Sequence, residues 1–90
     1  INSRSRVLGA LQKKISEAEE SIMQLEESIE KDTQTLLDAS VKGDGEAIKT
    51  FSKSIHEAKA KIDALFDELA SLTGEMEIKA KEFEEKLKSL

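Results

Sequence analysis

The side chains that could carry chemistry in this chain are one histidine, many acids and several serines. His56 is the single histidine of the 90 residues, and there is no cysteine. A zinc or thiol site would need further nitrogen or sulfur ligands, so His56 is interpreted as a solvated surface residue. The serines lack a recognisable base and orienting acid. We therefore expect no catalytic residue, metal site, cofactor site or small-molecule substrate in this segment.

The acidic and glycine-containing stretches do not match known ion or phosphate loops. The first half carries a dense set of acids, but without the Asp-rich loop of a calcium site. These acids are interpreted as a charged helix surface: Glu17, Glu19, Glu20, Glu26, Glu27 and Glu30. Gly43-Asp44-Gly45-Glu46 has neither the spacing nor the Lys-Ser/Thr pair of a P-loop.

Basic residues gather in two places where they could contact phosphate. The first group is Arg4, Arg6, Lys13 and Lys14, and the second is Lys42, Lys49 and Lys53. A simpler interpretation, which we favour, is attraction between acidic residues 15–41 and the lysines of residues 49–61. The net charge of −5 argues against tight autonomous nucleic-acid binding. It leaves room for a weak contact with nucleic acid or a ribosome inside a larger particle.

Two heptad series must position all of these residues. Steps of three and four alternate along each series, which is the spacing of a coiled-coil seam. The first series is Leu8, Leu11, Ile15, Ala18, Ile22, Leu25, Ile29, Asp32, Leu36 and Ala39. The second is Ile48, Phe51, Ile55, Ala58, Ile62, Leu65, Leu69, Leu72 and Met76. Four Gly and no Pro argue against a turn-rich β-sandwich or barrel, and the short apolar runs predict no membrane span.

The stretch between the two series predicts a tight turn. Gly43 suits the left-handed position that ends a helix. Asp44 suits the N-cap of the next helix, with Glu46 in its first turn. Facing seam positions then have residue numbers that add up to 87, which pairs Ile22 with Leu65. We therefore predict an all-α, two-helix antiparallel coiled-coil hairpin with helix 1 at about 4–42, a turn at 43–45 and helix 2 at about 45–89.

Two features depart from a simple hairpin. Asp32 lies on the seam opposite Ile55. Either its carboxylate is partly solvated and reaches Lys59 or Ser52, which is the explanation we favour, or it fixes the register of the two helices. After Met76 the apolar positions slip in phase, so that Phe83, Leu87 and Leu90 lack partners within the hairpin and form a candidate protein-contact surface. They could pack on residues 1–7, on a second copy or on an upstream segment. We expect the chain to be a piece of a longer protein.

The stretch from Leu11 to about Leu72, including the short acidic turn, resembles the C-terminal coiled-coil domain of Uup-type ABC-F ATPases, and three segments carry the resemblance. They are Leu11–Ile15 (LQKKI), Ile22–Glu27 (IMQLEE) and Ile62–Leu69 (IDALFDEL). Phe66 and Leu69 stand where the family commonly has Tyr and Trp. The resemblance implies a cytoplasmic parent that hydrolyses ATP with Mg and acts on translating ribosomes. This segment would be its non-catalytic accessory arm, in contact with nucleic acid, the ribosome or the parent's own ATPase domains.

Two other functions stay open. The chain could be a generic protein-interaction, dimerisation or spacer coiled coil without a nucleic-acid role, in which case self-association would use the C-terminal end. Two chains could also open and pair as a swapped or four-helix assembly, which we rank lower because the turn is short.

Overall fold

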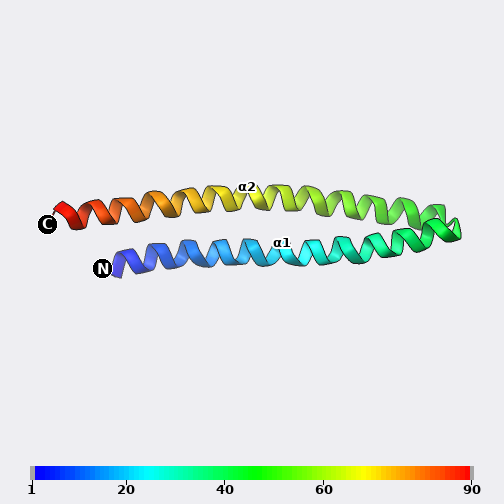
Figure 1. Cartoon of the computed structure of the whole chain (residues 1–90), viewed down its shortest axis with the longest axis horizontal. Coiled ribbons are helices and arrows are strands. Elements are labelled where there is room, and N and C mark those ends of the chain that lie inside the picture. Colours follow the sequence, from blue (N-terminus) through cyan, green and yellow to red (C-terminus); the bar gives the residue numbers. More distant parts are fainter. Residues whose placement is uncertain (1, 90) are drawn as a thin grey trace.

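The protein is a long antiparallel hairpin of two helices. The computed structural model describes residues 2–89, with α1 at Asn2–Lys42 and α2 at Gly45–Ser89. The helices lie side by side along their length (Figure 1), and the molecule measures 71 × 16 × 12 Å. The predicted all-α helical hairpin is therefore confirmed.

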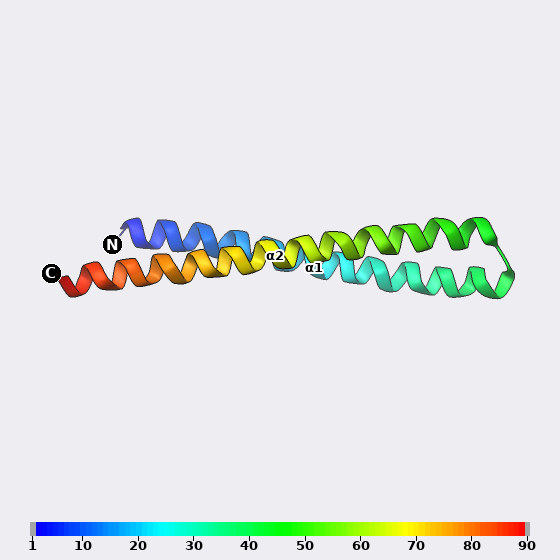
Figure 2. The same cartoon turned by 90° about the horizontal axis from the view of Figure 1, so that it is seen from above.

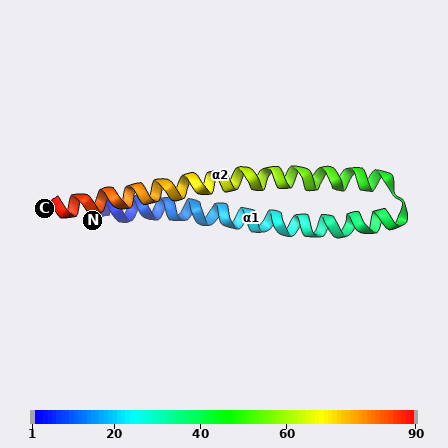
Figure 3. The same cartoon turned by 45° about the horizontal axis from the view of Figure 1, so that its top comes forward.

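The two helices wrap around each other, and α2 extends further than α1 at the open end of the hairpin. Seen from above, α2 crosses α1 near the middle of the rod (Figure 2), and the intermediate view shows the two helices converging toward the ends of the chain (Figure 3). The end of α2 extends beyond the start of α1 (Figure 1). This overhang leaves the last turns of α2 without a helix beside them.

Only two residues, Gly43 and Asp44, connect the helices, and they cap both of them. Gly43 has a φ of 72°, and its N–H donates to the Ser40 carbonyl at 3.3 Å. The N–H of Asp44 donates to the Ala39 carbonyl at 2.9 Å. These two bonds form a Schellman motif. The Asp44 Oδ1 then accepts the Ala47 N–H at 3.1 Å, which is the N-cap contact of α2.

The core of the hairpin is the seam predicted from the two heptad series. Every position of both series is buried or half-buried. The most buried side chains all belong to them: Leu11, Ile15, Ala18, Ile22, Ala39, Ala58 and Leu72. Among residues 4–89, no polar side chain is buried. The hairpin is thus held together by one thin apolar stripe per helix.

The packing near the open end of the hairpin agrees with the predicted register. Leu11, Ile15 and Leu72 form a cluster, and the half-buried side chains packed on it are Val7, Leu69 and Met76. The register pairs Ile15 with Leu72 and Leu11 with Met76, so each predicted pair falls inside this one cluster. Val7 extends the cluster by one residue beyond the predicted seam.

The seam changes beyond Met76. Lys79, Ala80 and Phe83 are half-buried there, whereas Ile78 and Leu87 are exposed. The half-buried residues are the strict heptad positions Lys79 and Phe83 and also Ala80, which directly follows one of them. α2 therefore continues past the seam with a broader apolar face than α1 covers.

Candidate functional site

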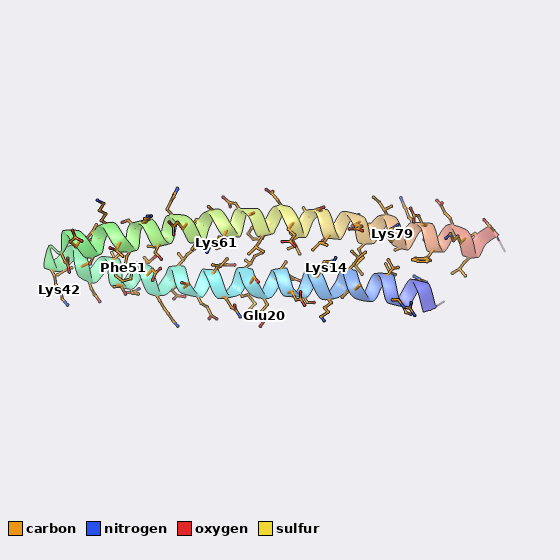
Figure 4. All side chains as sticks on the ribbon, turned by 180° about the vertical axis from the view of Figure 1, so that it is seen from behind. Lys14, Glu20, Lys42, Phe51, Lys61 and Lys79 are labelled. Carbon is orange, nitrogen blue, oxygen red and sulfur yellow. The ribbon has the colours of Figure 1, made fainter. Side chains whose placement is uncertain are left out.

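The turn end of the rod presents three lysines. Lys42 is the last residue of α1, and Lys49 and Lys53 follow one turn apart on α2. All three side chains are exposed, and Lys42 marks this end of the molecule in Figure 4. The same end carries exposed acids at Asp38, Asp44 and Glu46, so the lysines are offset one for one. The turn is therefore not an isolated basic patch.

The second basic group lies at the opposite end. Arg4, Arg6, Lys13 and Lys14 are exposed on the first turns of α1, and Figure 4 places Lys14 far from Lys42. Residues 2–16 of α1 contain no acid. The structure therefore does not bring the two basic groups together: they lie near opposite ends of a rod 71 Å long.

The predicted attraction between the arms does not take the form of direct ion pairs. Among residues 2–89, the ion pairs within 4 Å are Lys79 with Glu82 at 3.5 Å and Lys88 with Glu84 at 3.8 Å. Both lie within α2. The lysines at 49–61 are exposed to solvent, where water and salt screen their attraction to α1.

The candidate protein-contact residues lie on the overhang of α2. Leu87 is 56% exposed, and Phe83 is half-buried. The Lys86 Nζ lies 5.8 Å from the centre of the Phe83 ring, a cation–π contact that covers one face of this aromatic side chain. Leu90 is outside the described residues. An apolar surface next to few packing partners is the usual mark of a contact site.

Five further large apolar side chains are exposed, and none of them was predicted from the sequence as a contact residue. They are Met23, Leu37, Val41, Phe66 and Ile78. All five lie off the a/d spacing of the two series, so a search for apolar residues outside the seam would have found them. They are spread along the rod, and only Leu37 and Val41 lie one turn apart on the same helix.

Asp32 has a different partner from the two that were predicted. Its Oδ2 accepts a hydrogen bond from the Ser54 Oγ at 2.8 Å, so neither Lys59 nor Ser52 is the partner. Lys59 and Ser52 each follow a seam residue, whereas Ser54 precedes one. The Asp32 carboxylate thus leans to the other flank of the seam, where a serine hydroxyl fits the short reach between the helices.

The described part of the chain offers little for other chemistry. His56 is exposed, and residues 2–89 contain no group of three His, Cys, Asp or Glu side chains placed to hold a metal ion. Within the described residues, neither helix combines the length and the apolar character that crossing a membrane requires.

Comparison with known proteins identifies no relative. No protein-family model, no curated protein and no solved structure matches this chain.

Proposed function

We propose that this chain is a non-catalytic accessory arm that holds contact surfaces at the two ends of a rod. The carrying observation is the two-helix hairpin itself, 71 Å long, with its turn closed by a Schellman motif and an N-cap that share Asp44. A tight, doubly capped turn restricts how the helices can move relative to each other. The arm can therefore keep its ends at a set separation.

The resemblance to the Uup-type ABC-F coiled-coil domain supports a particular setting for the arm. In that setting the parent protein is a cytoplasmic ATPase whose ATP and Mg bind outside these 90 residues. The arm contacts nucleic acid, the ribosome or the parent's own ATPase domains. The quoted stretches and the hairpin architecture are the support for this proposal.

Of the two ends, the open end is better suited to a polyanion. Arg6 and Lys13 are exposed and lie seven residues apart, on the same side of α1, with no acid between residues 2 and 16. The lysines at the turn are offset by the three acids described above. The facing residues 73–83 of α2 add three acids and two lysines to the four basic residues of 4–14, so this end keeps a net positive charge. Phosphate binding depends on such an excess of positive charge.

A band-shift titration with DNA and RNA at about 20 and 150 mM salt tests this proposal. We expect weak binding at low salt that is lost in Arg6→Glu/Lys13→Glu. The matched control is Lys49→Glu/Lys53→Glu, which makes the same charge change at exposed positions near the turn. Absence of binding by the unmodified chain at low salt would contradict a nucleic-acid role, and loss only in the control variant would move the contact to the turn.

The second candidate function is a protein-interaction or dimerisation coiled coil without a nucleic-acid role. The exposed Leu87 and the half-buried Phe83 on the overhang favour it. Sedimentation equilibrium at several concentrations tests it, because self-association should disappear in Phe83→Ser/Leu87→Ser. A chain that stays monomeric at all concentrations would argue for a spacer.

A further inference from the structure

The second half of α2 carries a second apolar series that overlaps the seam. Its members again alternate in steps of three and four, and all but one are apolar: Phe66, Leu69, Thr73, Met76, Ala80, Phe83, Leu87 and Leu90. We call these eight positions the second seam. It shares Leu69 and Met76 with the seam against α1, and its other members lie to one side of that seam on the surface of α2. A helix with this wider apolar face is suited to packing against two neighbours instead of one.

The hairpin covers only part of the second seam: Leu69 and Met76 pack on the cluster with α1, whereas Phe66 and Leu87 do not. Phe66 is 51% exposed and Leu87 is 56% exposed, whereas Leu72, on the seam against α1, is 9% exposed. Ala80 and Phe83 are half-buried between these extremes. The end of α2 also projects beyond the start of α1 (Figure 1). An additional helix could therefore lie on this face without displacing α1.

Charged residues flank the second seam with a different sign on each side. At 3.6 residues per turn, Glu77 and Glu84 lie along one edge, and Lys79 and Lys86 lie along the other. In an antiparallel pair of such helices, like edges meet and the charges repel. In a parallel, in-register pair, unlike edges meet, and Lys79 lies beside the residue five positions later on the other helix, the partner's Glu84. The edge charges therefore select a parallel copy of the same segment.

We propose that the second seam binds the second seam of another copy of this chain, parallel and in register. The proposal rests on the protein-interaction function above and specifies its partner. The two rods lie side by side with both turns pointing the same way, related by a two-fold axis along their length. Such an interface is isologous, so the assembly closes at two copies. Each Lys79 then lies beside the partner's Glu84, and the two equivalent rim pairs compete with the exposed contacts of Lys79 with Glu82 and of Glu84 with Lys88 within α2.

Sedimentation equilibrium of the whole chain tests whether this face is the interface. We expect a monomer–dimer equilibrium that is lost in Leu87→Ser. Ile78→Ser is the matched control, because Ile78 is 59% exposed and lies about half a turn away from Met76 and Ala80. The dimer should persist in this control. A wild-type chain that is helical but monomeric up to about 1 mM, near the limit of weak association, would overturn the proposal, and so would equal loss in both variants.

Charge reversal tests the orientation. Glu84→Lys should weaken dimerisation roughly tenfold, because both rim pairs become repulsive, and Lys79→Glu/Glu84→Lys should restore it. Glu85→Lys is the control: like Glu84, Glu85 has lysines three and four residues away, at Lys81 and Lys88, but it lies on the side of α2 that is opposite the second seam. No effect of Glu84→Lys, or no rescue in the double variant, would overturn the parallel arrangement.

Cysteine cross-linking gives an independent readout of the register. The chain contains no cysteine, so Ala80→Cys introduces a single thiol at the centre of the second seam. In the parallel pair the two copies of position 80 face each other, and a disulfide should form rapidly in a glutathione buffer, whereas Ile78→Cys should cross-link slowly. If Leu87→Ser abolishes self-association but Ala80→Cys does not cross-link, the interaction function stands and the parallel register is wrong.

Discussion

Replacing Ile22 by Ala should destabilise the hairpin far more than the same change at the next residue. Ile22 lies on the seam and is 5% exposed, whereas Met23 is 63% exposed. Ile22→Ala removes three carbons from an almost fully buried side chain, at about 0.8 kcal/mol for each. The better helix propensity of Ala returns a few tenths of a kcal/mol. The expected loss is therefore about 2 kcal/mol, with a further contribution if the seam does not close over the gap.

Urea unfolding followed by circular dichroism measures this contrast. With a slope of about 1 kcal/mol/M, Ile22→Ala should lower the unfolding midpoint by roughly 2 M. Met23→Ala should leave the free energy of unfolding within about 0.5 kcal/mol. Both variants are compared at a protein concentration low enough to exclude self-association. Equal losses in the two variants, or a larger loss for Met23→Ala, would refute the assignment of the seam.

Four further substitutions test the turn, the interior of α2, its N-cap and the polar position on the seam by the same unfolding assay. Gly43→Ala should lower the free energy of unfolding by about 1–2 kcal/mol, because Gly43 has a φ of 72°. Gly74→Ala should instead raise it by about 0.5–1 kcal/mol, since Gly74 lies inside α2 and nothing lies within 4 Å of the added Cβ. The reverse order would contradict the assigned turn. Asp44→Ala should cost about 1 kcal/mol through loss of the N-cap, and an unchanged midpoint would show that the cap is dispensable. Asp32→Leu should stabilise the hairpin by up to about 1 kcal/mol, because burial of the leucine exceeds the net value of the hydrogen bond from Ser54; broadened NMR signals in this variant would instead identify Asp32 as a lock on the register.

The helices and their pairing were predictable because one local pattern determines both. Alternating steps of three and four specify the buried face of each helix, and the Gly43–Asp44 turn places the faces against each other. The constant sum of facing residue numbers then follows from antiparallel geometry alone. The buried Leu11, Ile15 and Leu72 cluster lies where that arithmetic puts it.

Details at the flanks of the seam were not predictable from spacing. Heptad positions indicate which residues lie near the partner helix, but not which way a short side chain such as Asp32 leans. That direction depends on small rotations of the two helices, and it selected Ser54 over Ser52 and Lys59. The ionic contacts of the lysines were likewise undetermined, because flexible exposed side chains have little energetic preference for one partner.

The candidate sites were predictable as individual residues but not as surfaces. Counting charge along the chain separates Asp38 from Lys49 and Lys53, whereas the fold brings all three to the turn end of the rod. The lysines at the turn therefore do not form a basic patch, because acidic residues lie at the same end of the rod. The phase slip after Met76 already predicts a contact surface at Phe83, Leu87 and Leu90. It does not show that this surface continues back to Phe66, because the second seam shares Leu69 and Met76 with the seam that holds the hairpin together.

The most direct test of the account is the distance between the two helices within one molecule. Spin labels on Gln24→Cys/Asp63→Cys report it, since both residues are exposed and the register places them at the same level along the two helices. The hairpin predicts a label separation of about 15–25 Å, because packed helices lie 8–10 Å apart and the labels add their own length. The distance should persist when labelled protein is diluted with unlabelled chain. A separation near 58 Å, the length of about 39 residues of continuous helix, or a short distance that vanishes on dilution, would contradict the hairpin.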